Sequence, residues 1–218
     1  MLFETFDRIR IINLPHRTDR RAEMLGELGR VGLVGDPRVQ FSDASSFADR
    51  SHFYSAGARG CFASHLAILE EAVAARQSIL ILEDDCDFTS HTQRFRLPQR
   101  WDIFYGGVAS ATDPSRLATS DLVGSHFMGF HADVLEPLVA WLQAAFHGDD
   151  PAPIDGEYVR FRRAHPHVVT VFAEPPVGVQ RPSRTDIGDL RAFDRVIGIR
   201  SAVALARKVK RIVRRLGT

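Results

Sequence analysis

Four acids within five positions form the strongest chemical feature of the sequence. Glu83, Asp84 and Asp85 follow one another, and Asp87 comes close behind. Holding several carboxylates this close costs Coulomb energy, which a bound cation would offset. No His or Cys pair at zinc spacing lies nearby in the sequence, so we expect oxygen ligands and a hard ion, Mg²⁺ or Mn²⁺. Such an ion keeps positions open for phosphates, and the acids therefore predict a metal site for a diphosphate.

The four branched aliphatic residues at 79–82, immediately before these acids, predict a buried strand. Side chains alternate along a strand, so Glu83 and Asp85 should share one side and Asp84 should take the other. We expect Glu83 and Asp85 to bind the metal, with Asp85 the more direct ligand, and we assign Asp87 to the following turn. The alternative is that the acids cap the turn or lie solvated at the rim of a sheet.

The succession of strand-like and helix-like segments predicts an α/β fold with a mixed, mainly parallel sheet flanked by helices. Ligands of open α/β sheets bind at the carboxyl ends of the strands, where these acids would project. Strands are expected at residues 8–14, 39–44, 79–82, 101–107, 124–131 and 168–173.

A basic segment follows the first predicted strand. Arg17 and Arg20 stand at the start of a helix that Thr18 or Asp19 can cap, and the helix N-terminus would face the same rim as the acids. Guanidinium groups and free backbone amides suit a nucleotide or its diphosphate. The alternative is that both arginines are simply solvated.

Histidines offer further candidates. His126, in the predicted strand 124–131, is a candidate third metal ligand, and the alternative is that it is hydrogen-bonded packing. His65 lies on a helix expected from Cys61 onward, next to Ser64. Adjacent helical side chains diverge by about 100 degrees, so these two do not form a nucleophile–base pair. We expect His65 to be structural or to support the site.

Composition indicates one large α/β domain, which we place at residues 1–198, followed by a tail at 199–218. The 218 residues are 44% hydrophobic and 25% charged, as is usual for a soluble globular protein. Two cysteines give no disulfide framework or metal cage, which suits a reducing cytoplasm. The sequence shows no signal peptide and no stretch of transmembrane length, so we expect a cytoplasmic protein.

The tail has the pattern of a basic amphipathic helix. Apolar residues recur from Leu205 to Leu216 at helical spacing, and residues 207–218 hold six cations and no acid. The remainder holds 22 basic and 27 acidic residues, a net charge of −5, which argues against nucleic-acid binding. Anionic lipid at the inner membrane face would attract the tail by about 1 kcal/mol per cation. The alternative is a helix packed on its own domain with a solvated basic face.

Taken together, the motifs resemble glycosyltransferase family 25, the lipooligosaccharide and collagen galactosyltransferase family. They run in the family's order through residues 8–188. The matching stretches are Ile11-Ile12-Asn13-Leu14 with Arg17-x-Asp19-Arg20, Gly60-Cys61-x-x-Ser64-His65, residues 79–85, Pro153-Ile154-Asp155, and residues 176–180 with 183–187.

The resemblance implies a GT-A-like, Rossmann-related fold, a UDP-hexose donor with galactose the expected sugar, a divalent metal, and inversion at the anomeric carbon. It further implies a glycan or lipopolysaccharide-type acceptor. Glu83 and Asp85 match the metal motif. The expected donor-binding residues are Asn13, Arg17, Arg20, Glu83, Asp84 and Gln180.

An inverting transfer needs a base on the face of the sugar opposite the departing diphosphate. A carboxylate far along the chain from the metal strand but at the same rim meets this need. Asp155, expected at a helix N-cap, is our first candidate for the base, and Glu157 is the second. The alternative is that Asp155 is only a helix cap.

Two other functions compete with a metal-dependent hexosyltransferase. One is a Mg²⁺-dependent phosphotransferase, which would require an aspartyl nucleophile and a Lys/Thr partner set that the sequence does not show. The other is a nonenzymatic membrane-surface module that retains a nucleotide-sugar fold.

Overall fold

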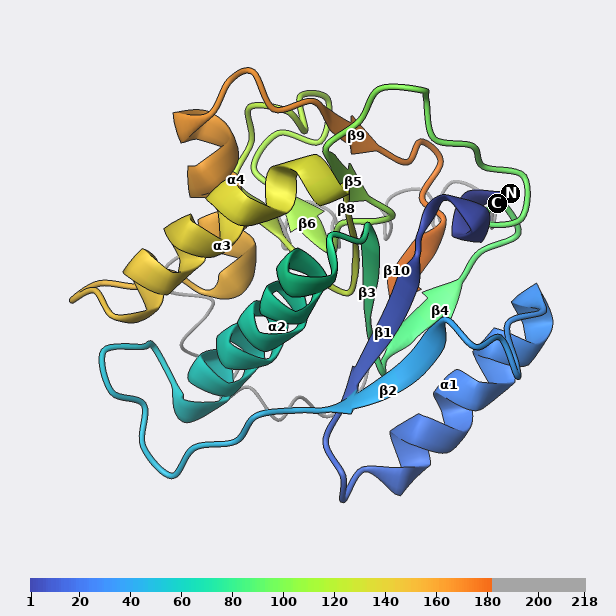
Figure 1. The fold of residues 1–218 in the computed structure, drawn as a ribbon, viewed down its shortest axis with the longest axis horizontal. Helices are drawn as coiled ribbons and strands as arrows, with labels where there is room; N and C mark the ends of the chain where they lie inside the picture. The colour runs from blue at the N-terminus through green and yellow to red at the C-terminus, as the bar shows by residue number, and fades with distance from the viewer. Residues whose placement is uncertain (182–218) are drawn as a thin grey trace, which may run out of the picture. The chain divides into compact units, whose positions relative to one another are not determined.

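A six-stranded sheet runs through the protein, seen here in a computed structural model that describes residues 1–181 (Figure 1). The strand order is β2-β1-β3-β8-β5-β9, and β8 runs antiparallel to both of its neighbours while the remaining pairs are parallel. This sheet confirms the predicted class, α/β with a mixed, mainly parallel sheet flanked by helices. The strands are β1 (Arg8–Asn13), β2 (Val39–Asp43), β3 (Ile79–Glu83), β5 (Ile103–Tyr105), β8 (Phe127–Phe130) and β9 (Thr170–Phe172).

Strand β3 separates two hydrophobic cores. Ile79 and Ile81 point into one core, and Leu80 and Leu82 point into the other, each fully buried. Burying one such side chain stabilises the fold by about 1.5–3 kcal/mol. A continuous aliphatic run is therefore required here, because both faces of the sheet are covered by helices.

The helices divide between the two faces of the sheet (Figure 1). Helix α1 (Thr18–Val31) packs with the short 3-10 helix η1 (Leu2–Thr5) on the face of Leu80 and Leu82. Helices α2 (Ala56–Ala75), α3 (Ala132–Phe146) and α4 (Ile154–Ala164) cover the opposite face. None of the helices within residues 1–181 is both long enough and apolar enough to cross a membrane.

Two predicted helix caps are wrong. Helix α1 has Arg17 at its N-cap with no side-chain cap hydrogen bond, so Thr18 and Asp19 lie inside the helix. Helix α4 has Pro153 at its N-cap, which places Asp155 in the first turn. The carboxylate of Asp155 is therefore not needed as the N-cap of its own helix.

The carboxyl edge of the sheet gathers segments that are far apart in the sequence. Strands β1 and β3 are parallel and end side by side at Asn13 and Glu83, and the antiparallel β8 starts at this same edge, directly after His126. A small antiparallel pair, β4 (Cys86–Phe88) with β10 (Gly178–Gln180), then carries the chain back to the acids. A second pair, β6 (Ser110–Ala111) with β7 (Leu122–Val123), lies in the segment before β8.

The predicted amphipathic tail at residues 199–218 and the matching motif stretch at 183–187 lie outside the described residues. The proposed domain boundary at residue 198 also falls there.

Candidate active site

A tight turn joins β3 to β4 and carries the acids at the carboxyl edge of the sheet. Glu83 is the last residue of β3, and Asp84 and Asp85 form the turn and are both buried. Glu83 lies beside His65 of α2, whereas Asp84 and Asp85 both lie beside Arg20 of α1. The predicted placing of Glu83 and Asp85 on one side is therefore wrong, because the strand ends at Glu83 and the alternation does not continue through the turn. The structure therefore divides three neighbouring carboxylates between different environments.

Asp84 is held by a buried polar network. Its Oδ2 accepts a hydrogen bond from Asn13 Nδ2 at 2.7 Å, and its Oδ1 accepts one from Arg20 Nη1 at 2.9 Å. Asn13 also donates to the carbonyl oxygen of Arg17 at 3.2 Å. The network ties the end of β1 and the start of α1 to the acidic turn. Three of the predicted donor-binding residues, Asn13, Arg20 and Asp84, are thus already engaged with one another.

Arg17, a further predicted donor-binding residue, lies at the outer side of this network. Its Nη2 lies 2.8 Å from Asp19 Oδ2, and that carboxylate is largely exposed. Arg17 stands at the start of α1, as the sequence predicted, but its side chain forms an ion pair with Asp19 in the first turn of that helix.

Asp85 faces an environment unlike that of Asp84. Its Oδ2 accepts a long hydrogen bond from Gln180 Nε2 at 3.4 Å and lies 3.6 Å from Arg20 Nη1. Its Oδ1 is buried and has no hydrogen-bond partner among residues 1–181. Burial, with the charge of Glu83 added, raises the pKa of Asp85 to about 7. A divalent cation would supply the missing partner and favour the ionised carboxylate, so this side chain fits the predicted metal ligand.

The surroundings of Glu83 favour its ionised form. Its Oε1 accepts a hydrogen bond from Ser125 Oγ at 2.6 Å and lies 3.7 Å from His65 Nε2. Burial opposes ionisation, but His65 and Ser125 outweigh it and lower the pKa of Glu83. The pKa values of Glu83 and Asp85 are thus shifted in opposite directions although the two residues are only two positions apart.

Asp155 comes to the same region from helix α4. Its Oδ2 accepts from the backbone N–H of Gly124 at 3.0 Å, and its Oδ1 accepts from that of Gly156 at 2.9 Å. Gly124 has φ +119°, a backbone conformation that favours glycine. Burial raises the pKa of Asp155, and the negative charge of Glu83 adds to the effect. A carboxylate with a raised pKa is a better proton acceptor, which fits the predicted base.

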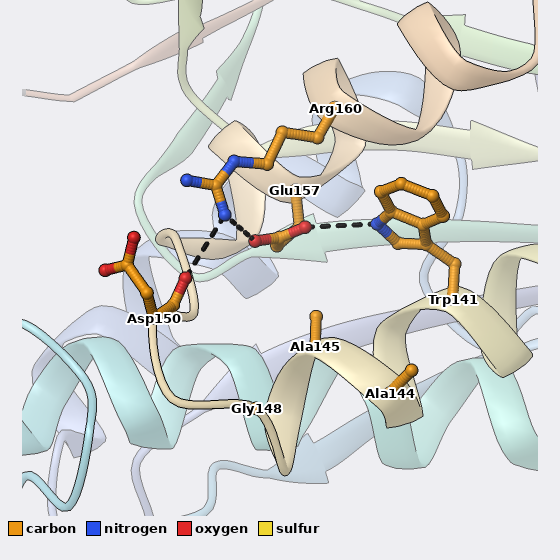
Figure 2. Close-up of a pocket in the computed structure, with 7 residues that line it drawn as sticks. All are labelled: Trp141, Ala144, Ala145, Gly148, Asp150, Glu157 and Arg160. Atoms are coloured by element: carbon orange, nitrogen blue, oxygen red, sulfur yellow. Dashed lines mark hydrogen bonds and ion pairs between the residues drawn. The ribbon is translucent and has the colours of Figure 1, made fainter.

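Glu157, the second candidate for the base, has a structural role instead (Figure 2). The buried carboxylate accepts hydrogen bonds from Trp141 Nε1 at 3.1 Å, from the backbone N–H of Ala152 at 2.9 Å and from Arg160 Nη1 at 2.7 Å. It lies at a pocket of about 260 Å³ whose lining contains none of the acidic-turn residues. The structure therefore brings Asp155 to the acids and does not bring Glu157. The pocket is lined by Trp141, Ala144, Ala145, Gly148, Asp150, Glu157 and Arg160.

His126 is buried at the start of β8. Neither ring nitrogen has a hydrogen-bond partner among residues 1–181, and burial lowers the pKa of the ring. Its backbone carbonyl accepts from the N–H of Glu83 at 3.1 Å, so the residue adjoins the acidic strand. A neutral imidazole with unused nitrogens suits metal ligation. Glu83, Asp85 and His126 do not, however, form a closed three-ligand cluster in the described residues.

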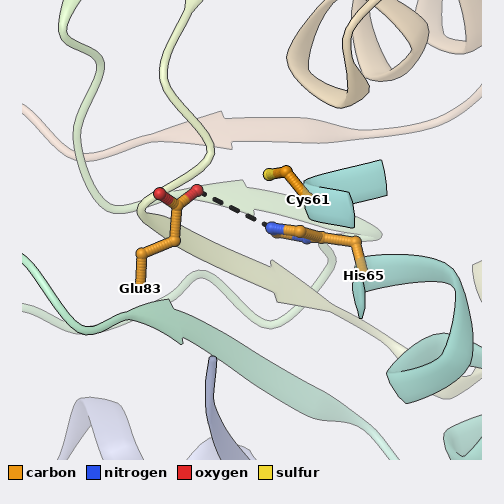
Figure 3. Close-up of side chains that lie close together, drawn as sticks. All are labelled: Cys61, His65 and Glu83. Atoms are coloured by element: carbon orange, nitrogen blue, oxygen red, sulfur yellow. Dashed lines mark ion pairs between the residues drawn. The ribbon is translucent and has the colours of Figure 1, made fainter. Parts of the chain in front are cut away.

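Within residues 1–181, the three side chains close enough together to bind one metal ion are Cys61, His65 and Glu83 (Figure 3). One ligand atom from each lies within 4.8 Å of the others. The sequence has no His or Cys pair at zinc spacing near the acids and predicted oxygen ligands, but folding brings Cys61 and His65 to Glu83. Cys61 and His65 are four positions apart on α2, a spacing that puts them on one helix face, and this signal was present in the sequence.

Comparison with known proteins agrees with the resemblance seen in the motifs. Residues 6–99 match the family described as "Glycosyltransferase family 25 (LPS biosynthesis protein)". This match assigns residues 6–99 to glycosyltransferase family 25. The predicted resemblance is thereby confirmed, and together with the mixed sheet it supports the GT-A-like fold.

The curated relatives that this chain matches are distant from it. The human protein "Inactive glycosyltransferase 25 family member 3" is 30% identical over 155 residues, which are 57% of this chain and 26% of that protein. An Anopheles gambiae "Glycosyltransferase 25 family member" is 33% identical over 129 residues, 47% of this chain and 22% of that protein. The chain thus spans about a quarter of the length of these curated relatives.

A solved glycosyltransferase, "involved in the glycosylation of the major capsid of PBCV-1", superposes with a TM-score of 0.49 at 10% sequence identity. The superposition covers 77% of this chain and 82% of that one.

Proposed function

We propose that this protein is an inverting, metal-dependent glycosyltransferase that moves a hexose from a UDP-sugar to a glycan acceptor. The observation that carries the proposal is Asp85, whose buried Oδ1 has no protein partner within residues 1–181 and whose pKa is raised to about 7. A buried carboxyl in this state is costly for the fold unless a cation or ligand group meets it. Membership of the family supplies the expectation of a sugar donor.

In the proposed reaction, one group of residues binds the metal ion and another residue accepts the proton. Asp85, with Glu83 and His126, would hold Mn²⁺ or Mg²⁺, which when bound neutralises the departing diphosphate. Arg20 and Gln180 both lie near Oδ2 of Asp85 and orient its carboxylate. Asp155 accepts the proton of the attacking hydroxyl, because its raised pKa makes it a stronger base than an exposed aspartate.

Galactose as the sugar, and a cell-surface glycan or lipopolysaccharide as the acceptor, are further parts of the proposal. They rest on the family resemblance and on the family description as an LPS biosynthesis protein. The basic residues of the tail would keep a cytoplasmic enzyme near anionic lipid at the inner membrane face. Sedimentation with anionic vesicles, compared with neutral ones, tests this location, and equal binding to both would contradict it.

A binding protein without transfer activity is the second candidate. The human relative at 30% identity is named inactive, which favours this alternative. A protein of this kind would bind the nucleotide-sugar without turning it over. Measuring binding and turnover separately therefore distinguishes the two functions.

The deciding experiment is a screen of UDP-sugars with Mn²⁺ and Mg²⁺, in which both thermal stability and release of UDP are measured. We expect stabilisation by UDP only when metal is present, and release of UDP from one donor. Asp85→Asn should lose both effects. Asp87→Asn is the matched control, because Asp87 belongs to the same acidic run but pairs with Arg181, whose Nε lies 3.0 Å from its Oδ1. Equal loss in both variants would contradict the assignment of Asp85.

A further inference from the structure

The cluster of Cys61, His65 and Glu83 contains two side chains, Cys61 and His65, that have no role in the proposed transfer. Cys61 and His65 project from successive turns of α2 toward the end of β3, where Glu83 stands (Figure 3). Thiolate, imidazole and carboxylate together are the donor set of a borderline cation such as Zn²⁺. The oxygen-rich site expected at Asp85 suits harder ions.

Two observations beyond proximity point to a ligand at this cluster. His65 is completely buried, and its Nε2, which faces Glu83, has no hydrogen-bond partner among the described residues. On the other side of the ring, Nδ1 lies 3.0 Å from the hydroxyl of Tyr158. A metal ion bound by Nε2 would displace any proton that this nitrogen presents to Glu83, while Nδ1–H donates to the Tyr158 hydroxyl oxygen. Metal-bound histidines are commonly oriented in this way by a partner on the second nitrogen.

Glu83 is oriented as well. Its Oε1, the atom 3.7 Å from His65 Nε2, also accepts a hydrogen bond from Ser125 Oγ at 2.6 Å. The carboxylate therefore keeps one oxygen fixed toward α2. Glu83 ends the strand two residues before Asp85, so the two sites would have Glu83 in common and differ in their other ligands.

We propose that Cys61, His65 and Glu83 bind a borderline divalent cation of the zinc class, at a site that shares only Glu83 with the hard-cation site proposed at Asp85. On binding, the Cys61 thiol loses its proton to solvent as the sulfur–metal bond forms, so no oxidant or reductant is involved. Three protein ligands leave one coordination position for water or another ligand.

Cobalt(II) is the direct probe, because a cobalt–thiolate bond gives a charge-transfer absorption band in the near ultraviolet. We expect the full chain to show this band and Cys61→Ser to lose it. Cys86→Ser is the matched control, since Cys86 is buried in the core on the other face of the sheet and should leave the band intact. Tyr158→Phe should keep the band with about 10-fold weaker affinity, because His65 loses its orienting partner.

Asp85→Asn separates this inference from the proposed function. The variant should keep the cobalt band while it loses metal-dependent binding of UDP. A band that disappears with Asp85→Asn but persists in Cys61→Ser would overturn the separate site.

A measurement on the unaltered protein covers the case in which Cys61→Ser does not fold. Zn²⁺ should slow alkylation of Cys61 by iodoacetamide, as followed by mass spectrometry of the peptide that contains it. Absence of a cobalt band in the unaltered protein, or equal alkylation rates with and without Zn²⁺, would overturn the proposal.

Discussion

Asp84 and Asp85 are neighbours in the chain, yet their surroundings are opposite. Both oxygens of Asp84 accept hydrogen bonds from buried side chains, Asn13 and Arg20, that tie together β1, α1 and the turn. Asp85 has one buried oxygen without a partner in residues 1–181 and a pKa raised to about 7. A satisfied buried carboxylate stabilises the fold, whereas an unsatisfied one costs stability and is retained for another reason. The comparison therefore assigns structure to Asp84 and binding to Asp85.

Asp155 and Glu157 repeat this contrast on the first turn of α4. Glu157 accepts hydrogen bonds from Trp141, Ala152 and Arg160 and is nearly inaccessible. Among residues 1–181, Asp155 accepts hydrogen bonds only from backbone N–H groups, and its pKa is raised by burial and by the charge of Glu83. Both contrasts lead to predictions about which carboxylate of each pair matters for stability and which for activity.

The largest effect is expected at Asp155. Asp155→Asn removes the proposed base, and sugar transfer should fall by about 10²- to 10⁴-fold. Binding of UDP with metal should be unchanged, because the proposed metal ligands are intact. Steady-state transfer rates and thermal shifts with UDP and Mn²⁺ measure the two quantities. Retention of full transfer activity would end the role of Asp155 as base.

Asp84→Asn should be the most damaging of these substitutions for folding. It removes the charge that compensates the buried guanidinium of Arg20, whose side chain is 10% exposed. We expect a loss of about 3 kcal/mol in the free energy of unfolding, measured by urea denaturation. Asp19→Asn, which breaks an exposed pair with Arg17, is the control and should leave the unfolding midpoint in place. If Asp84→Asn and Asp19→Asn were equally stable, the structural role assigned to Asp84 would be wrong.

The raised pKa of Asp85 predicts a pH dependence. An unfolded aspartate titrates near pH 4, so the metal-free folded protein binds this proton more tightly. The contribution of Asp85 to the free energy of unfolding should therefore fall as pH rises from about 4 to about 7, and the full penalty should be present above that range. Asp85→Asn removes the penalty, so its stability relative to the unaltered protein should increase by about 1–3 kcal/mol between pH 4 and pH 8.

Urea denaturation of the two proteins across this pH range, without metal, tests the prediction. A difference in stability that stays constant with pH would show that Asp85 titrates normally. Addition of Mn²⁺ at pH 8 should then stabilise the unaltered protein and leave Asp85→Asn unaffected.

The smallest effect is expected at Glu157. Glu157→Gln replaces one acceptor oxygen by an amide and should cost about 1 kcal/mol in the free energy of unfolding. The transfer rate should stay within about 2-fold of the unaltered protein, since the side chain does not face the acids. A loss of transfer comparable to that of Asp155→Asn would reverse the assignment of the two carboxylates.

Much of the fold was predictable because its signals are local. The aliphatic run of β3 and the strands at residues 8–14 and 168–173 follow from period and composition, and the structure confirms each of them. The helix caps of α1 and α4 were predicted wrongly, because Arg17 and Pro153 occupy the N-caps without any side-chain hydrogen bond. Neither Arg17 nor Pro153 is one of the Ser, Thr, Asp or Asn residues by which an N-cap is recognised in a sequence.

The site was predictable only in part. The run of acids at 83–85 was evident in the sequence, but the sequence did not show which of these carboxylates would be hydrogen-bonded by other side chains. That depended on Asn13 and Arg20 reaching Asp84 across the parallel strands, and on β10 bringing Gln180 to Asp85.

The sequence by itself determined a buried strand ending in carboxylates, an α/β sheet to hold it, and motifs in the order of glycosyltransferase family 25. Only the tertiary structure decided that Asp84 is hydrogen-bonded to Asn13 and Arg20. It also decided that Asp155 rather than Glu157 lies near the acids, and that Cys61 and His65 lie beside Glu83. The physical reason is that composition and period act over a few residues, whereas burial and charge pairing depend on segments that folding alone brings together.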